Sequence, residues 1–117
     1  MSEKTIAAYL EGMKDAEEFL HTLGFRRLSS RRKGWLFIDK FIRGTTVIEF
    51  LFGPPEWHCE IVVEIAGRAV GSRDLVSNPK AEEWIEDNKD NVENACGLGS
   101  EPLWWARLFA HSLSWIE

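Results

Sequence analysis

The fold is decided by residues 35–65, which read WLFIDKFIRGTTVIEFLFGPPEWHCEIVVEI. Apolar and polar side chains alternate along this stretch, most regularly in residues 57–65, where every second residue is apolar. A period of two residues is typical of a strand with one buried face. Arg43-Gly44 and the Gly53-Pro54-Pro55 run interrupt the pattern as turn residues do. The sequence therefore predicts three consecutive antiparallel strands, over residues 35–42, 45–52 and 57–65.

The segments on either side of these strands are less regular. Residues 4–23 carry apolar side chains at helical spacing and predict a first helix, which ends at Gly24. Residues 25–28 indicate a short additional strand, and residues 29–34 have the polar composition of a turn. Residues 66–76 contain two glycines and are interpreted as a connecting loop or an irregular strand extension.

Two helices are predicted after the strands. Asn78 has the side chain of a helix cap, and Pro79 is suited to the first position of a helix that continues to Cys96. A last helix is expected from about Pro102 to Ile116. Because the strands follow one another without intervening helices, the chain is expected to form one α+β domain over residues 1–117. We expect an antiparallel meander of three to four strands, with the helices mainly on one face.

Composition limits the classes of function. The chain has 117 residues, of which 44% are hydrophobic and 28% charged, and these values are typical of a globular domain. No stretch approaches the roughly 20 apolar residues of a membrane span, and the N-terminal residues do not resemble a signal peptide. With only two cysteines to form a disulfide, we expect a cytoplasmic protein. The net charge of −5 argues against nucleic acid as a partner.

Charge is distributed unevenly along the chain and around the predicted helix. Residues 1–50 hold nine basic and seven acidic residues, whereas residues 51–117 hold five basic and twelve acidic residues. At about 100° per residue, six carboxylates of the second helix fall on one side, opposite Trp84 and Ile85. This predicted acidic face consists of Glu82, Glu83, Glu86, Asp87, Asp90 and Glu93. Lys89 is the one basic residue among them, so helical Glu–Lys pairing is largely absent.

The acidic face has two interpretations. It is either the solvated side of an amphipathic helix, which is the commoner case, or a contact surface for a basic protein. The second interpretation predicts a small acidic protein that binds its partner stoichiometrically, as an adaptor or as an inhibitor. Immunity proteins, which neutralise a basic partner, are comparable in size and charge, but no motif links this chain to them.

The last helix suggests a different function. It is apolar almost all round, and such a helix is usually buried on more than one side. The side chains that would form an interface between two copies are Trp104, Trp105, Leu108 and Trp115. Tryptophan is enriched where interfaces concentrate their binding energy. A homo-oligomeric structural protein is therefore the alternative to a binding protein.

An enzyme or small-ligand site has the weakest support. His58, Glu60 and Glu64 share one face of the strand over residues 57–65, and Glu49 is the neighbouring carboxylate that could join them. Outward polar residues are also what a half-exposed strand needs, so no catalytic residue, metal ligand or cofactor is predicted. The basic segment Arg26–Lys33 is interpreted as a charged edge or turn that resists aggregation. If it forms a hairpin tip, it could instead contact phosphate, an acidic protein or the acidic face of a second copy.

Overall fold

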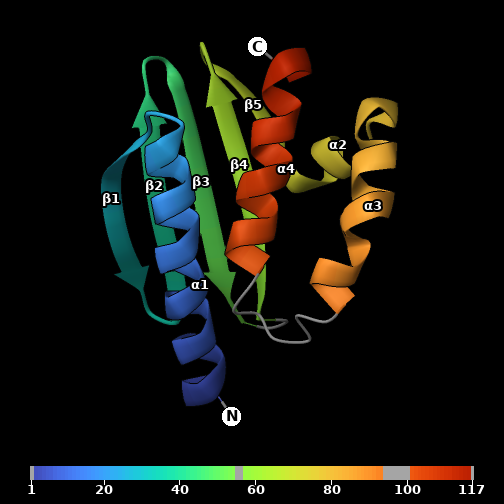
Figure 1. Ribbon diagram of the computed structural model, residues 1–117. Coiled ribbons are helices and arrows are strands. Elements are labelled where there is room, and N and C mark those ends of the chain that lie inside the picture. Colours follow the sequence, from blue (N-terminus) through green and yellow to red (C-terminus); the bar gives the residue numbers. More distant parts are fainter. Residues whose placement is uncertain (1, 55–56, 94–100, 117) are drawn as a thin grey trace.

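The computed structural model describes residues 2–54, 57–93 and 101–116 (Figure 1). Its elements in chain order are α1 (Ser2–Thr22), β1 (Arg26–Lys33), β2 (Leu36–Arg43), β3 (Thr46–Gly53), β4 (His58–Ile65), β5 (Arg68–Gly71), α2 (Ser72–Ser77), α3 (Glu82–Glu93) and α4 (Glu101–Ile116). The five strands lie side by side in chain order, and each is antiparallel to the next. The predicted α+β class and meander topology are confirmed.

The predicted number of three to four strands was wrong, because β5 adds a fifth. Its four residues pair with the end of β4, from Arg68 opposite Ile65 to Gly71 opposite Val62. The strand is too short and too exposed to show an alternating pattern. Where β5 ends, the Ser72 hydroxyl donates to the backbone carbonyl of Ile61 at 2.9 Å and accepts from its N–H at 2.7 Å. Ser72 thereby replaces the missing strand partner and begins the short helix α2, which was not predicted.

The expected polar turn over residues 29–34 was also wrong, because β1 continues to Lys33. Its residues face β2 in antiparallel register, with Arg31 opposite Ile38 and Lys33 opposite Leu36. A strand at the edge of a sheet tolerates charged side chains, since its backbone pairs on one side only. The turn itself is confined to Gly34 and Trp35, and Gly34 takes the positive φ of 63° that glycine adopts without strain.

The core lies between the sheet and one layer of helices. α1 and α4 pack side by side over one face, and no helix of the described residues lies over the other face (Figure 1). Every second residue of β3, from Thr46 to Phe52, is buried against these helices. The Tyr9 ring stacks on Phe52 with centroids 4.3 Å apart and an interplanar angle of 8°. Burial of one sheet face explains why β3 and β4 were predictable from their alternation.

A buried polar network ties α1 to the first two strands. The Asp39 carboxylate, 5% exposed, accepts a hydrogen bond from the Tyr9 hydroxyl at 2.7 Å and one from Arg27 Nη1 at 2.6 Å. Arg27 Nη2 also donates to Glu17 at 2.8 Å. Burial of the Arg27 guanidinium acts to lower its pKa, but the hydrogen bonds to Glu17 and Asp39 outweigh this effect and the pKa is raised. Arg27 is therefore a fixed cation that neutralises Asp39.

Candidate functional site

The acidic face begins where a short 3-10 helix, Pro79–Ala81, leads into α3. The Asn78 side chain accepts a hydrogen bond from the backbone N–H of Lys80 at 2.9 Å, so the predicted cap is confirmed. The α-helix proper starts at Glu82, three residues later than predicted. Residues 94–96 at the end of the predicted helix lie outside the described residues.

Four carboxylates of the predicted face are exposed on α3: Glu82, Glu83, Glu86 and Asp87. Together with Pro79 they line a shallow hollow of about 430 Å³. Among the described side chains, none forms an ion pair with Glu82, Glu83 or Asp87. The side chains of the two remaining members, Asp90 and Glu93, lie outside the described part of the chain. The outer side of α3 therefore presents at least three carboxylates that form no ion pair with a described side chain.

The opposite side of α3 packs on α4 through aromatic side chains. The Trp84 ring lies 5.6 Å from the Trp104 ring and is stacked on His111 at 5.8 Å, with an interplanar angle of 22°. Asn88 reinforces the contact, because its backbone carbonyl accepts a hydrogen bond from Trp104 Nε1 at 3.1 Å. These contacts fix the helix rotation, so Trp84 faces α4 while Glu83 and Asp87 remain exposed.

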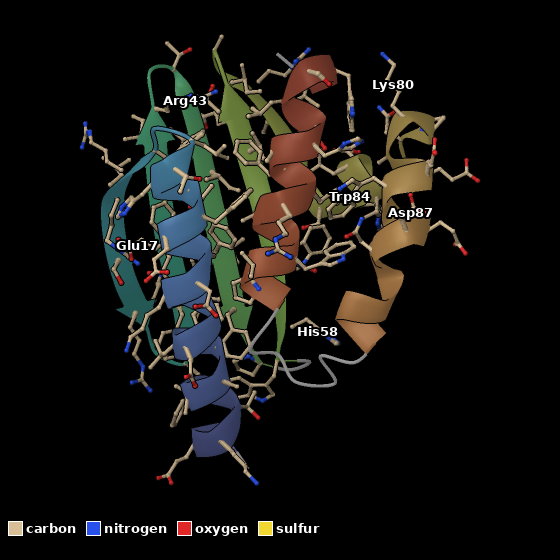
Figure 2. All side chains as sticks on the ribbon, viewed as in Figure 1. Glu17, Arg43, His58, Lys80, Trp84 and Asp87 are labelled. Carbon is tan, nitrogen blue, oxygen red and sulfur yellow. The ribbon has the colours of Figure 1, made fainter. Side chains whose placement is uncertain are left out.

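A second hollow joins this packing to the carboxylates. We call it the aromatic hollow; it measures about 240 Å³ and is lined by Lys80, Glu83, Trp84, Asp87 and His111. Trp84 lies between α3 and α4, and Lys80 lies near the start of α3 (Figure 2). An aromatic ring next to two carboxylates is a suitable environment for an organic cation. The sequence did not reveal this hollow, because His111 joins it only through the packing of α4.

The predicted interface residues of α4 are divided between core and surface. Trp104 and Leu108 are buried within the chain, whereas Trp105 and Trp115 are partly exposed. Much of the apolar surface that suggested an interface is therefore used in packing against α1 and the sheet. Of the helices that the structure describes, none has the length and apolarity needed to cross a bilayer.

The polar residues of the sheet are spread over its open face, the one without helices. Glu49 forms an ion pair with Lys40 at 3.3 Å and lies opposite Val62 in the register, between Glu60 and Glu64 on β4. His58 is the first residue of β4, where it lines a hollow of about 340 Å³ with Glu60 and residues of β2 and β3. Within the described ranges, no cluster of three His, Cys, Asp or Glu side chains could hold a metal ion. The register thus separates Glu49 from His58 rather than joining them in one site.

The basic segment Arg26–Lys33 is also divided by the strand it forms. Arg27 and Arg32 lie toward the helix layer, since their guanidinium groups lie over the rings of Phe41 and Phe37, at 4.8 and 4.9 Å. The residues that alternate with them, among them Arg31 and Lys33, are exposed on the open face. The segment therefore presents a row of cations at the edge of the open face and no cluster at a hairpin tip.

Comparison with known proteins finds no matching family model, no matching curated protein and no matching solved structure. The function has to be inferred from the chemistry of the surfaces described above.

Proposed function

We propose that this protein acts by stoichiometric contact with a basic protein, and that the acidic face of α3 is its contact surface. The observation that carries the proposal is the exposure of Glu82, Glu83 and Asp87 without an ion-pair partner among the described side chains. Like charges on one helix face destabilise the helix by a few tenths of a kcal/mol per pair. A cationic partner would convert this repulsion into attraction.

The charge distribution of the whole chain supports the same proposal. Residues 51–117 carry seven more acidic than basic residues, and α3 lies in this half. Opposite charge on two partners accelerates their encounter and discriminates against partners of the wrong sign. Binding through α3 is therefore expected to be fast and to weaken as salt is added.

The aromatic hollow would supply the short-range part of the contact. A guanidinium group would donate hydrogen bonds to Glu83 or Asp87 beside the Trp84 ring, in competition with Lys80, which lines the same hollow. A cation over a tryptophan face contributes about 0.5–2 kcal/mol, depending on how far it is desolvated. The partner is thus expected to place an arginine at the centre of the contact.

In this proposal the protein is an adaptor or an inhibitor of the immunity type, since contact alone is its action. We place it in the cytoplasm, where a buried thiol such as Cys59 stays reduced. An acidic contact surface also disfavours nucleic acid as the partner, because phosphates would be repelled.

The test compares charge reversals on two helices. Tagged wild-type protein, the double variant Glu83→Lys/Asp87→Lys and the control Glu11→Lys/Glu18→Lys are used to capture proteins from an extract of the source cells. The control makes the same charge change at exposed positions of α1. A true partner is retained by the wild type and the control, is lost with the α3 variant, and binds one to one in titration calorimetry.

A second variant tests the hollow separately. Trp84→Phe keeps an aromatic ring against His111 but weakens the cation–π interaction, so we expect the affinity to fall about three- to tenfold. Retention of the same partner by the α3 double reversal would remove the acidic face as the contact surface. Binding that does not saturate at one partner per chain would remove the stoichiometric mechanism.

A further inference from the structure

On the open face of the sheet, apolar side chains predominate on the two central strands and charged side chains on the two strands that flank them. The centre of this face consists of partly exposed apolar side chains on β2 and β3: Leu36, Ile38, Ile42, Val47 and Leu51. Among them lies one ion pair, between Lys40 and Glu49. Apolar side chains on both sides of this ion pair, on a face that no described helix covers, indicate an interaction surface.

The two strands that flank this centre have opposite charge. On β1, Arg26 and Arg31 are exposed and lie opposite Ile42 and Ile38 of β2. On β4, Glu64 and Glu60 are exposed and lie opposite Val47 and Leu51 of β3. The residue pairs across the four strands, which include a β-bulge between Arg27 and Ser29 of β1, place each cation at the same height along the strands as one carboxylate. On the open face, β1 is therefore basic, β2 and β3 are apolar apart from the Lys40–Glu49 ion pair, and β4 is acidic.

We propose that the open face binds a second copy of this chain, with a two-fold axis that runs parallel to the strands between β2 and β3. This rotation exchanges β1 with β4 and β2 with β3 while it preserves height along the strands. Arg31 would then face Glu60 of the second copy, and Arg26 would face Glu64. At the centre, Ile38 would meet Leu51 and Lys40 would meet Glu49, each from opposite copies.

The charge pattern selects this axis over the other two-fold arrangement of stacked sheets. An axis perpendicular to the strands would place β1 on β1 and β4 on β4, which brings like charges together. Like-charge juxtaposition across an interface costs several kcal/mol. The parallel axis instead pairs Arg26 and Arg31 with Glu64 and Glu60, while Lys33 lies beyond these pairs at the end of β1. It is also compatible with the aligned packing of two sheets, about 30° apart.

The size of the surface predicts a reversible dimer. Strands β1 to β4 have eight residues each. With strands about 4.8 Å apart and about 3.3 Å per residue, they cover roughly 500 Å² in projection. Standard stable interfaces bury about 800 Å² on each partner. We therefore expect association that depends on protein concentration and on salt.

A charge swap tests the pairing. Within one copy, Arg31 and Glu60 are separated by three strand spacings, about 14 Å, which exceeds the screening length of about 8 Å at physiological salt. An intramolecular interaction between them therefore cannot explain a rescue. The variants are Arg31→Glu, Glu60→Arg and their combination. Arg107→Glu, at an exposed position of α4, is the control for a charge reversal elsewhere on the surface. Sedimentation velocity over a concentration series measures the dissociation constant, and near-ultraviolet circular dichroism verifies folding.

Each single reversal changes two symmetric contacts, so we expect it to raise the dissociation constant at least about tenfold. The combined variant should return it to within about threefold of the wild type, and the control should leave it unchanged. A wild type that is monomeric at the highest soluble concentration overturns the proposal. So does a dimer that persists in both single variants, or one that the combined variant does not restore.

This proposal is independent of the contact through α3. The open face and the acidic face lie on different elements and share no residue. Failure of the charge swap would leave the capture experiment with Glu83 and Asp87 unaffected.

Discussion

Removal of the Asp39 carboxylate is the most direct test of how the fold is held together. Asp39 is 5% exposed and accepts hydrogen bonds from Tyr9 at 2.7 Å and from Arg27 at 2.6 Å. Asp39→Ala would leave the fully buried Tyr9 hydroxyl without its acceptor and would remove the nearer anion from Arg27. α1 and β1 would both lose a polar contact to β2.

The loss of stability depends on the hydrogen bonds that Tyr9 and Arg27 keep after the carboxylate is removed. Breaking a buried ion pair by removing one partner costs about 3–5 kcal/mol. The lower end applies here, because Arg27 keeps its hydrogen bond to Glu17 at 2.8 Å and its side chain is 30% exposed. An orphaned buried hydroxyl costs about 1–3 kcal/mol and is part of this total. We therefore expect a loss of about 3 kcal/mol, a large part of the roughly 5–15 kcal/mol of a typical domain.

Urea unfolding followed by tryptophan fluorescence measures this loss, and Tyr9→Phe provides the matched comparison. Phenylalanine keeps the stacking on Phe52 and removes only the hydroxyl, so its cost should be about 1 kcal/mol. In the double variant, Asp39→Ala no longer leaves a buried hydroxyl without an acceptor. The loss of stability should therefore be smaller than the sum of the two single losses by about 1 kcal/mol. A cost below about 1 kcal/mol for Asp39→Ala, or strict additivity, would refute the reasoning.

The remaining predictions concern alkaline pH and the end of the sheet. Burial, and then the Asp39 carboxylate, raise the pKa of Tyr9, the one tyrosine of the chain, far above its ordinary value. The folded state therefore keeps this proton where the unfolded state loses it, and stability should fall by about 1.4 kcal/mol per pH unit above about pH 10. Tyr9→Phe should lack this part of the slope, and tyrosinate absorbance should appear only with unfolding. Ser72→Ala should cost about 1–3 kcal/mol of stability and expose the Ile61 amide to hydrogen exchange. The control Ser77→Ala, at an exposed position of α2, should cost under about 0.5 kcal/mol.

The strands that sequence reasoning placed well are those with one buried face. β3 and β4 start within one residue of their predicted bounds, because the buried side of the sheet imposes an apolar residue at every second position. β1 and β5 lie at the edges of the sheet, where most side chains are exposed, and so no such pattern is imposed. Their pairing is determined by backbone hydrogen bonds to a neighbour, which leave no signature in the sequence.

The same distinction applies to the candidate sites. The acidic face was predictable, since residues three or four positions apart share a helix side and the signal is local. The aromatic hollow was not, because Trp84 and His111 are brought together by the packing of α3 on α4. The network of Tyr9, Arg27 and Asp39 was missed for a similar reason. In the sequence, Arg27 is one of several arginines, and only the fold shows that it is used internally.

The location of the charges gives the two proposed surfaces separate roles. Arg26 and Arg31 are the cations nearest to the acidic strand of a second copy, so a dimer would hide part of the basic charge of residues 1–50. The carboxylates of α3 would remain exposed, since α3 packs on α4 on the helix side of the sheet. Because Glu60 and Glu64 would be hidden with Arg26 and Arg31, the net charge per copy would not change, and a dimer would present two acidic faces with twice the net charge of one copy. Association through the sheet would then strengthen, and not compete with, the attraction of α3 for a basic protein.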